Sequence, residues 1–484
     1  MVTRRTIRRG LAGSVALGVL AVLPGVATAA DALPTYAPAP DAKPVEGKTS
    51  TGDAPKIDPG TYTDSLKRGE KKLYALELDG SSTAYVSAVA APAPDTKVED
   101  YTDGLTVSVQ DSNGATCGPD GDVRFHGGKT AYPIGDYASR RIGSDLSECQ
   151  QAGPYYAVVE RPGDATSGPD SWPVELHYVT EPRLTGAAPA EPGKGSWSSA
   201  TPAPPTEGKQ KTVKGGTSFN DAASVGEGQW KDRIRPGETR FYRVPVDWGQ
   251  QLNVSAELSS TARKPGTGIS SFVPEALGLT AYNPARGLVS DESFKAYEGK
   301  QTPVRLFTAP VDYGNRFSDD DAVSPMRFAG WYYLEVSLNP DAAQFFKKDA
   351  DLTLRVGLKG AAKPGPQYAE PATAFSVTSE DRGLAETGRA ASEAERSGHL
   401  RTVGYAGIGI GAALLAGLGV WTARARRKAA ITMAATGPAA GAPGGQGAQI
   451  PGQQPYGAQN GAQDAGQGFG QGSGRAPGSR PPQS

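Results

Sequence analysis

The sequence predicts an all-β protein with two tandem antiparallel β-sandwiches of a jelly-roll-like kind, followed by one C-terminal transmembrane helix. Three observations predict this architecture: a stretch that occurs twice, short alternating strands around each copy, and one apolar run near the C-terminus. The 484 residues include 63 glycines and 40 prolines, and 37% are hydrophobic. This composition is typical of globular domains joined by long linkers.

The repeated stretch indicates a duplicated domain. Residues 62–79 read YTDSLKRGEKKLYALELD, and residues 230–247 read WKDRIRPGETRFYRVPVD. At one offset of 168 residues (237 − 69), Gly69 matches Gly237 and Tyr74 matches Tyr242. An aromatic residue, an aspartate, a Gly-Glu turn and an alternating strand agree in register, which is the signature of an internal repeat.

Short strands with alternating side chains surround each copy. Apolar and polar residues alternate over 105–109 in the first copy and over 252–258 in the second, and turn residues separate the strands. The tyrosine pairs at 155–156 and 332–333 match at an offset of 177, so insertions lie in loops. No helical period competes, and this pattern favours antiparallel sandwiches. Pro245 lacks a backbone N–H, which predicts an edge strand there.

Composition divides the chain into eight segments. They are a signal peptide (1–29), a disordered leader (30–55), a first β-sandwich (56–183), a Pro/Ser/Gly linker (184–216), a second β-sandwich (217–360), a stalk (361–402), a transmembrane helix (403–422) and a disordered cytoplasmic tail (423–484). The leader, linkers and tail are assigned because they lack apolar periodicity and are rich in small, polar and proline residues.

The N-terminus carries the features of an export signal. Four arginines among residues 4–9 precede the apolar run Leu11 to Leu23, and Ala27-Thr28-Ala29 is a small-residue cleavage site. The run Thr3 to Ile7 also resembles a twin-arginine signal, so the general secretory route and the twin-arginine route both remain open.

The apolar run Val403 to Thr422 predicts a membrane anchor. Its 20 residues are uncharged, and at ~1.5 Å per residue they match the ~30 Å hydrocarbon core of a bilayer. Arg424, Arg426, Arg427 and Lys428 follow at once, so the C-terminus is expected in the cytoplasm and the sandwiches outside. Small residues spaced four apart in the run would allow self-association of two such helices.

A second motif offers another mode of attachment. Leu384, Ala385, Glu386, Thr387 and Gly388 resemble the Leu-Ala-x-Thr-Gly sorting signal of one sortase class, followed by an apolar span and a basic stop. The resemblance implies cleavage between Thr387 and Gly388 and a cell-wall protein as the alternative to a membrane protein. A mixed-charge stalk explains the same residues without a sortase.

The second copy resembles a known kind of module. The sequence Asn220 to Ala223, the strand Phe241 to Val244 and the segment Gly330 to Tyr333 are similar to the pre-peptidase C-terminal type of β-sandwich. That family comprises small secreted modules attached to extracellular enzymes. The resemblance implies binding or accessory work, and not catalysis. For a protein held outside the cell, we expect the partner to be an envelope protein or a glycan.

Cys117 and Cys149 are the only cysteines in the sequence. In an exported chain such a pair, on either side of the irregular loop Gly118 to Glu148, predicts a disulfide. A metal site is the less favoured alternative, because only His126 lies near the cysteines in sequence.

Other site chemistry finds little support. His177 alternates outward on a strand, His126 lies in a turn, and His399 adjoins the apolar run, so each histidine has a structural explanation. Without a Gly-x-Ser-x-Gly elbow we expect no catalytic residues, and we expect no cofactor. A secreted hydrolase or peptidase-associated protein remains the alternative.

Two acidic clusters and the net charge bear on possible ligands. The clusters at 111–122 and 319–321 offer oxygens for calcium, but hairpin turns select the same residues. The formal net charge of −1 argues against nucleic acid as a partner.

Overall fold

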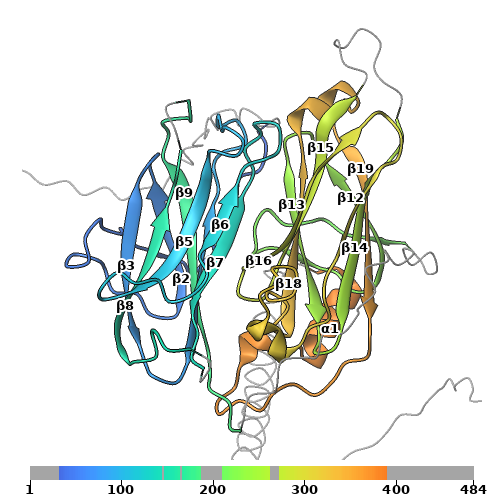
Figure 1. Ribbon diagram of the computed structural model, residues 1–484. Coiled ribbons are helices and arrows are strands. Elements are labelled where there is room, and N and C mark those ends of the chain that lie inside the picture. Colours follow the sequence, from blue (N-terminus) through green and yellow to red (C-terminus); the bar gives the residue numbers. More distant parts are fainter. Residues whose placement is uncertain (1–31, 144–145, 164–165, 187–209, 262–271, 390–484) are drawn as a thin grey trace, which may run out of the picture. The chain divides into compact units, whose positions relative to one another are not determined.

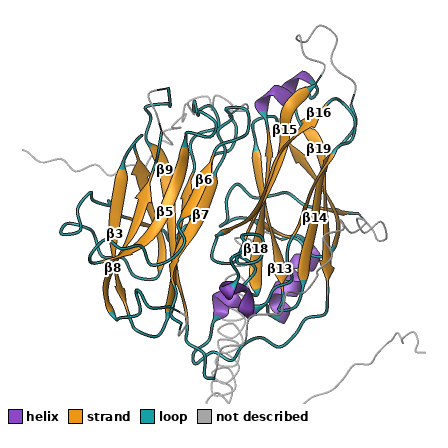
Figure 2. Ribbon diagram, in the orientation of Figure 1, coloured by secondary structure: helices purple, strands orange, loops and turns teal. Residues whose placement is uncertain are grey.

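The structure, a computed structural model, describes residues 32–143, 146–163, 166–186, 210–261 and 272–389. These residues form two β-sandwiches of two sheets each (Figure 1), and strands far outweigh helices (Figure 2). The prediction of two tandem sandwiches is thereby confirmed. The predicted signal peptide, the span Val403 to Thr422 and His399 lie outside the described residues.

The first sandwich is built from nine strands. They are β1 (Lys43–Pro44), β2 (Gly60–Leu66), β3 (Lys71–Leu78), β4 (Thr83–Ala90), β5 (Gly104–Asp111), β6 (Gly121–Arg124), β7 (Ile134–Arg140), β8 (Gly153–Glu160) and β9 (Trp172–Glu181). One sheet has the order β1-β2-β9-β4-β7 and the other the order β3-β8-β5-β6. Every pairing is antiparallel except that of β1 with β2.

The second sandwich has ten strands and three short 3-10 helices, with one α-helix after them. They are β10 (Lys211–Thr212), β11 (Ala223–Ser224), β12 (Gly228–Ile234), β13 (Thr239–Val246), β14 (Gln251–Leu258), β15 (Val273–Tyr282), β16 (Leu288–Tyr297), β17 (Pro303–Phe307), η1 (Tyr313–Phe317), β18 (Gly330–Leu338), η2 (Pro340–Gln344), β19 (Ala350–Lys359), η3 (Thr373–Phe375) and α1 (Ser379–Thr387). The sheets have the orders β10-β12-β19-β14-β17 and β11-β13-β18-β15-β16.

The duplication extends to the register of individual residues. Tyr74 pairs with Ala157 across β3 and β8, and Tyr242 pairs with Leu334 across β13 and β18. These partners are related by the same offsets, 168 and 177, that relate the two sequences. Apolar positions recur because the same alternation fills the same core, and both tyrosines are fully buried. The orders of the other strands agree in both sandwiches, and β11 is additional in the second.

Pro245 agrees with the edge position expected for it. In β13 it pairs with Trp331 of β18 on one side. On the other side, β11 pairs only with Tyr242 and Arg243. At Pro245, β13 is therefore the outer strand, and its missing N–H costs no ladder hydrogen bond there.

Three segments expected to be linkers are partly folded. In the leader, β1 pairs with β2 and Ile57 is buried just beyond the expected boundary. At the end of the 184–216 linker, β10 pairs with β12. In the stalk, α1 begins with a capping box at Thr378 and ends at Gly388 in the left-handed conformation. The Pro/Gly-rich composition of these segments is typical of linkers. In addition, a two-residue strand is too short to show an alternating pattern.

The disulfide prediction is confirmed. Cys117 and Cys149 are bonded, and their Cα atoms lie 5.5 Å apart. The loop between them was expected to be irregular, and this is wrong, since β6 and β7 lie within it. Gly and Asp residues at 118–122 have the composition of a turn, so the sequence does not reveal β6. A second turn at 127–133 separates β6 from β7 and leaves no long alternating pattern.

Side chains from the two sandwiches contact one another in two apolar clusters. One contains Val89 with Phe219, Phe241 and Tyr282, and the other contains Tyr85 with Phe328 and Phe375. Glu181 lies beside the second cluster. It receives two hydrogen bonds from Arg316, at 2.9 and 2.8 Å, and one each from the hydroxyls of Tyr85 and Tyr368.

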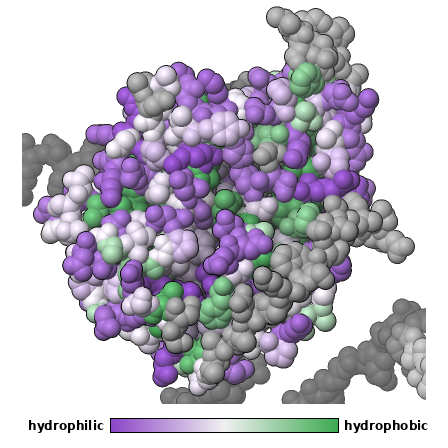
Figure 3. All heavy atoms as spheres, viewed as in Figure 1, coloured by the Kyte–Doolittle hydropathy of each residue, from purple (hydrophilic) through white to green (hydrophobic). Residues whose placement is uncertain are grey.

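The surface offers little apolar area for docking. Figure 3 shows a face dominated by hydrophilic residues, with hydrophobic residues in small groups between them. Among the described residues, the exposed large hydrophobic side chains are Tyr101, Phe272 and Phe307. Within the same residues, no helix has the length and hydrophobicity that a membrane crossing requires.

Candidate functional site

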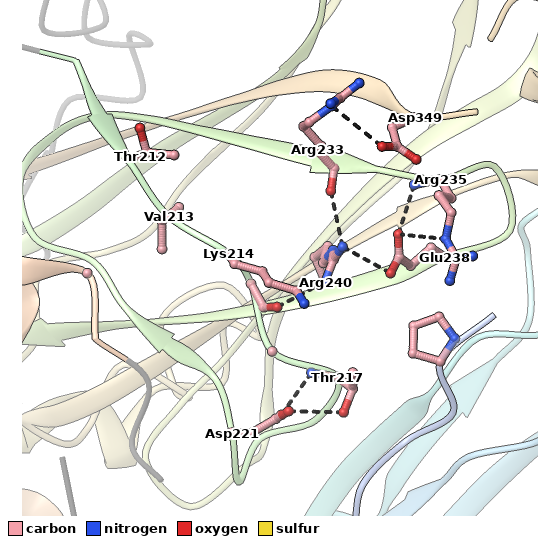
Figure 4. A pocket seen from close by; sticks show the side chains of 14 residues that line it. Thr212, Val213, Lys214, Thr217, Asp221, Arg233, Arg235, Glu238, Arg240 and Asp349 are labelled. Atoms are coloured by element: carbon pink, nitrogen blue, oxygen red, sulfur yellow. Dashed lines mark hydrogen bonds and ion pairs between the residues drawn. The ribbon is translucent and has the colours of Figure 1, made fainter. Parts of the chain in front are cut away.

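A polar pocket of about 790 Å³ opens on the second sandwich. It is formed by the segment from β10 to Asp221, by the end of β12 and the turn into β13, and by single residues from three other segments (Figure 4). The lining residues are Pro34, Thr212, Val213, Lys214, Gly215, Gly216, Thr217, Asp221, Arg233, Arg235, Glu238, Arg240, Asp349 and Gly388.

A buried aspartate fixes one wall of this pocket. Asp232 accepts hydrogen bonds from the backbone N–H of Gly215 and from the hydroxyl of Tyr242, each at 2.7 Å. Burial, and then the negative charge of Asp232, raise the pKa of Tyr242 far above its ordinary value, so the hydroxyl stays protonated and donates. A Cβ at Gly215 would meet the Tyr242 ring at 2.9 Å, so glycine allows this close approach.

The turn between β12 and β13 forms the opposite wall. Gly237 has a φ of 85°, a backbone conformation that favours glycine. Glu238 accepts from the backbone N–H of Arg235 at 2.8 Å and forms an ion pair with Arg240 at 3.1 Å. Arg240 also donates to the carbonyl oxygen of Gly215 at 3.1 Å, so its guanidinium joins the two walls.

The first sandwich repeats this pocket on a smaller scale, with a volume of about 430 Å³. Its lining residues are Glu46, Gly47, Lys48, Thr49, Asp53, Asp64, Ser65, Lys67, Glu70 and Lys72. Asp64 accepts from the N–H of Gly47 and the hydroxyl of Tyr74, each at 2.8 Å. These are the contacts of Asp232 displaced by 168 residues, so the duplicated domain includes a duplicated pocket.

Sequence patterning does not predict the basic lining of the larger pocket. Lys214 lies in the segment 184–216, which has the composition of a linker, and Arg233, Arg235 and Arg240 belong to the repeated stretch. A usable signal existed, because the offset of 168 carries Gly47 onto Gly215 and Thr49 onto Thr217. The repeat therefore begins well before residue 217.

His126 takes part in a contact between the two sandwiches. Its Nε2 is bonded to Asp291 of β16, and this partner raises the pKa of His126. Its Nδ1 is buried and has no hydrogen-bond partner among the described residues. The His126 side chain is 17% exposed, and its bond to Asp291 links the first sandwich to the second.

His177 was expected on a solvated face, and this is wrong in part. Its ring is only partly exposed and lies 3.2 Å from the Thr61 hydroxyl. Burial, and then the positive charge of Arg286, lower the pKa of His177 to about 3. Arg286 belongs to the second sandwich and pairs with Glu175 in the first, so contacts made by the second sandwich cover this strand face.

The acidic clusters serve their own turns. Asp111 accepts from the N–H groups of Asn113 and Ala115, at 2.8 and 2.9 Å. Asp320 accepts from the N–H of Ala322 at 2.9 Å. Within the described ranges, no three His, Cys, Asp or Glu side chains are grouped as metal ligands would be. These bonds account for Asp111 and Asp320 as turn residues.

The segment that resembles a sorting signal lies in α1. Ala385 is 2% exposed, and its carbonyl oxygen accepts from the N–H of Gly226 at 2.8 Å. Gly388 ends the helix close to the Trp230 ring and also lines the pocket. Whether a sortase acts on Thr387 and Gly388 stays a prediction.

Comparison with known proteins gives distant likenesses only. No protein-family model and no curated protein matches the sequence, so the resemblance to pre-peptidase C-terminal modules stays a prediction. The tandem CBM22-1-CBM22-2 domains of Paenibacillus barcinonensis Xyn10C share 12% identity, with 69% of this chain and 100% of that chain covered, at a TM-score of 0.16.

Two other solved structures give similar values. The ANXUR2 extracellular domain from Arabidopsis thaliana shares 10% identity over 63% of this chain and 86% of its own, with a TM-score of 0.18. Aeromonas hydrophila PliG, a periplasmic lysozyme inhibitor, shares 15% identity over 31% of this chain and 98% of its own, with a TM-score of 0.15. Likenesses at this level carry no argument about ligand or activity.

Proposed function

We propose that this protein is a non-catalytic binding protein of the cell envelope, and that its binding site is the larger pocket on the second sandwich. The observation that carries the proposal is the pocket itself. It combines a rigid wall at Asp232 with outward charged side chains from several segments. A polar recess of this size on a fixed scaffold suits recognition of a polar ligand.

The chemistry of the lining favours binding over catalysis. Neither the larger nor the smaller pocket is lined by histidine or cysteine. The carboxylate of Glu238 is engaged by Arg235 and Arg240, and Asp221 accepts from Thr217 and Ser218. Carboxylates held in this way are poor general bases, and no observation favours the hydrolase alternative.

The proposed place of action is outside the cytoplasm. The disulfide between Cys117 and Cys149 supports this, because such bonds persist in oxidising compartments. We further propose that the span Val403 to Thr422 holds the protein in the membrane with its C-terminus in the cytoplasm, and that its small residues permit self-association. The envelope ligand would be a protein or a glycan.

Blocking the pocket tests the proposal directly. Thr212 is exposed and lines the pocket, so Thr212→Trp places a bulky side chain at its edge without changing its charge. We expect this variant to lose at least about tenfold in affinity for membrane-free envelope material, measured by co-sedimentation of the full chain in detergent, so that the proposed span does not itself carry the protein into the pellet. Thr102→Trp, at an exposed loop position of the first sandwich, is the matched control and should bind as the parent does. Equal binding by the two variants would refute the pocket as the site.

The mode of attachment needs a separate experiment. Cells are fractionated and probed with antibodies against the second sandwich and against the C-terminal tail. A membrane fraction containing both signals supports the plain span. A form without the tail, released only by a cell-wall hydrolase, supports cleavage at Thr387. A sandwich signal found wholly in the medium would contradict both modes.

A further inference from the structure

The two pockets share a backbone arrangement but carry opposite charge. The larger pocket is lined by four basic and three acidic residues, and the smaller by three basic and four acidic residues. Two exchanges contribute most to the reversal, and Gly216 in place of Lys48 acts against it. Lys214 of the larger pocket stands where the smaller has Glu46, and Arg233 stands where the smaller has Ser65.

The acidic residues of the larger pocket are each held by ion pairs or hydrogen bonds to neighbours, while its lining keeps one positive charge in excess. Arg233 forms an ion pair with Asp349 at 3.5 Å. Glu238 pairs with Arg240, and Asp221 accepts four hydrogen bonds from the backbone and hydroxyl groups of Thr217 and Ser218. The carboxylates therefore offer little further attraction to an incoming cation.

Two cationic groups in this pocket keep unused donors. The Lys214 side chain is exposed, and no hydrogen bond or ion pair to it is found among the described residues. Arg240 is 9% exposed, and its Nε is buried without a hydrogen-bond partner in the same part of the chain. A buried N–H of a charged group is costly to leave unpaired, so an acceptor supplied by a ligand would stabilise it.

Two of the basic side chains are also close in sequence. Arg233 is the penultimate residue of β12 and Arg235 directly follows the strand, one before and one after buried Ile234. In extended chain, residues two apart are separated by about 7 Å. Figure 4 shows both side chains on the side of the pocket that also holds Asp349 and Glu238. Such a row can meet successive negative groups of an extended chain.

We infer that the larger pocket binds an anionic group, phosphate or carboxylate, carried on an extended envelope polymer, and that the smaller pocket does not. This inference rests on the proposed function and specifies its ligand class. Phosphate and carboxylate share the chemistry that guanidinium and ammonium groups recognise. The Glu46 carboxylate at the position of Lys214 repels the same ligand from the smaller pocket.

Titration of the full chain with defined polymers tests the inference. The probes are polyphosphate, polygalacturonate and neutral dextran, each at low and moderate salt. We expect binding of at least one anionic polymer, weakened by salt, and none of dextran. Preference for polyphosphate identifies phosphate as the recognised group, and preference for polygalacturonate identifies carboxylate. Failure of both anionic polymers, or equal binding of dextran, would overturn the inference.

Variants for this test replace residues of the larger pocket with those found at the same positions in the smaller pocket. The double change Lys214→Glu and Arg233→Ser gives the larger pocket the residues of the smaller, and we expect at least about a tenfold loss of affinity for the preferred polymer. Lys300→Glu, which removes two of the three units of charge that the double change removes, is the control for unspecific attraction, because Lys300 is 83% exposed at its side chain and lies outside the pocket. An equal loss with Lys300→Glu would show unspecific attraction and contradict the inference.

Failure of this inference is distinguishable from failure of the proposed function. If Thr212→Trp abolishes envelope binding while the double charge variant retains it, the pocket is the site but its ligand is not anionic. If neither change affects envelope binding, both are wrong. All three substituted side chains are exposed, so folding can be verified by unchanged thermal unfolding.

Discussion

In the first sandwich Asp64 joins Gly47 to Tyr74, and in the second Asp232 joins Gly215 to Tyr242 with distances that agree within 0.1 Å. Glu46 and Lys214, which flank these contacts and face solvent, carry opposite charges. Buried acceptors are constrained because losing one leaves donors unpaired, whereas an exposed side chain can change at little cost. The scaffold was therefore retained while the surface of the pocket diverged.

The largest effect on stability is expected from Glu181→Ala, which tests whether the two sandwiches are separate units at all. Glu181 is 2% exposed and pairs with Arg316 of the second sandwich. Removing it leaves a buried guanidinium uncompensated, at a cost of about 3–5 kcal/mol in the free energy of unfolding. Urea denaturation measures the loss. Glu77 is exposed, so Glu77→Ala should have almost no effect on the free energy of unfolding. If Glu181→Ala has a similarly small effect, the buried pair of Glu181 and Arg316 does not stabilise the fold.

Removing the disulfide sharpens the comparison, because only the first sandwich has one. Cys117 and Cys149 are 32 residues apart, and closing such a loop contributes roughly 3–4 kcal/mol on the chain-entropy model. We expect Cys117→Ser with Cys149→Ser to destabilise the first sandwich by about that amount. Limited proteolysis during urea unfolding reports which sandwich opens first. Preferential opening of the second sandwich would contradict the expectation.

The buried aspartates should both matter if the duplicated pockets share one scaffold. Asp64→Asn and Asp232→Asn each weaken bonds to a backbone N–H and a tyrosine hydroxyl, and each should cost roughly 1–3 kcal/mol. Asp64→Asn should cost more, because Asp64 also forms a buried ion pair with Lys72 at 2.8 Å. Tyr74→Phe and Tyr242→Phe remove a single bond and should cost less. Thermal unfolding of the four variants measures both pairs. A large loss at one aspartate and none at the other would break the comparison.

The smallest effect concerns pH at the contact between His126 and Asp291. The carboxylate of Asp291 raises the pKa of His126, and Asp100 lies near enough to act in the same direction. A raised pKa stabilises the folded state fully below the ordinary value of about 6.5, and this contribution is lost as pH rises through the raised value.

Comparison with His126→Gln isolates this contribution, because His177 has a lowered pKa and acts in the opposite direction below about pH 6.5. We expect the melting temperature of the parent to exceed that of His126→Gln by more at pH 5.5 than at pH 8.5. A gap that is the same at both pH values, or larger at pH 8.5, would show that the ion pair does not stabilise the fold.

The sequence predicts the sandwiches well because strand periodicity and the repeat report the same core. Tyr74 and Tyr242 could be aligned without coordinates, since each lies in an eight-residue strand with a clear alternation. The pocket could not be predicted in this way. Lys214 follows a strand of two residues, and its neighbours Gly215 and Gly216 have the composition of a linker.

The histidines and the stalk illustrate a second limit of the sequence. The surroundings of His177 depend on Arg286, more than a hundred residues away, so strand alternation alone assigns its face incorrectly. The helix α1 contains polar residues on most sides, with only Ala385 buried, and its position depends on bonds from Trp331 and Arg382 to partners distant in sequence. Periodicity reports neither kind of contact.

The position of α1 has a mechanical consequence. If the chain is tethered beyond Arg389, tension enters the second sandwich at the hydrogen bond from the N–H of Ser224 to the carbonyl oxygen of Arg389. It then loads the contacts that hold α1, among them Trp331 with Asp381 and Arg382 with Asp247. These contacts lie in series with the tether and bear its full force. We therefore expect them to break before the strands of the sandwich slide past one another. Single-molecule pulling from the C-terminus should show a weak first rupture that releases α1, and Trp331→Phe should lower its force.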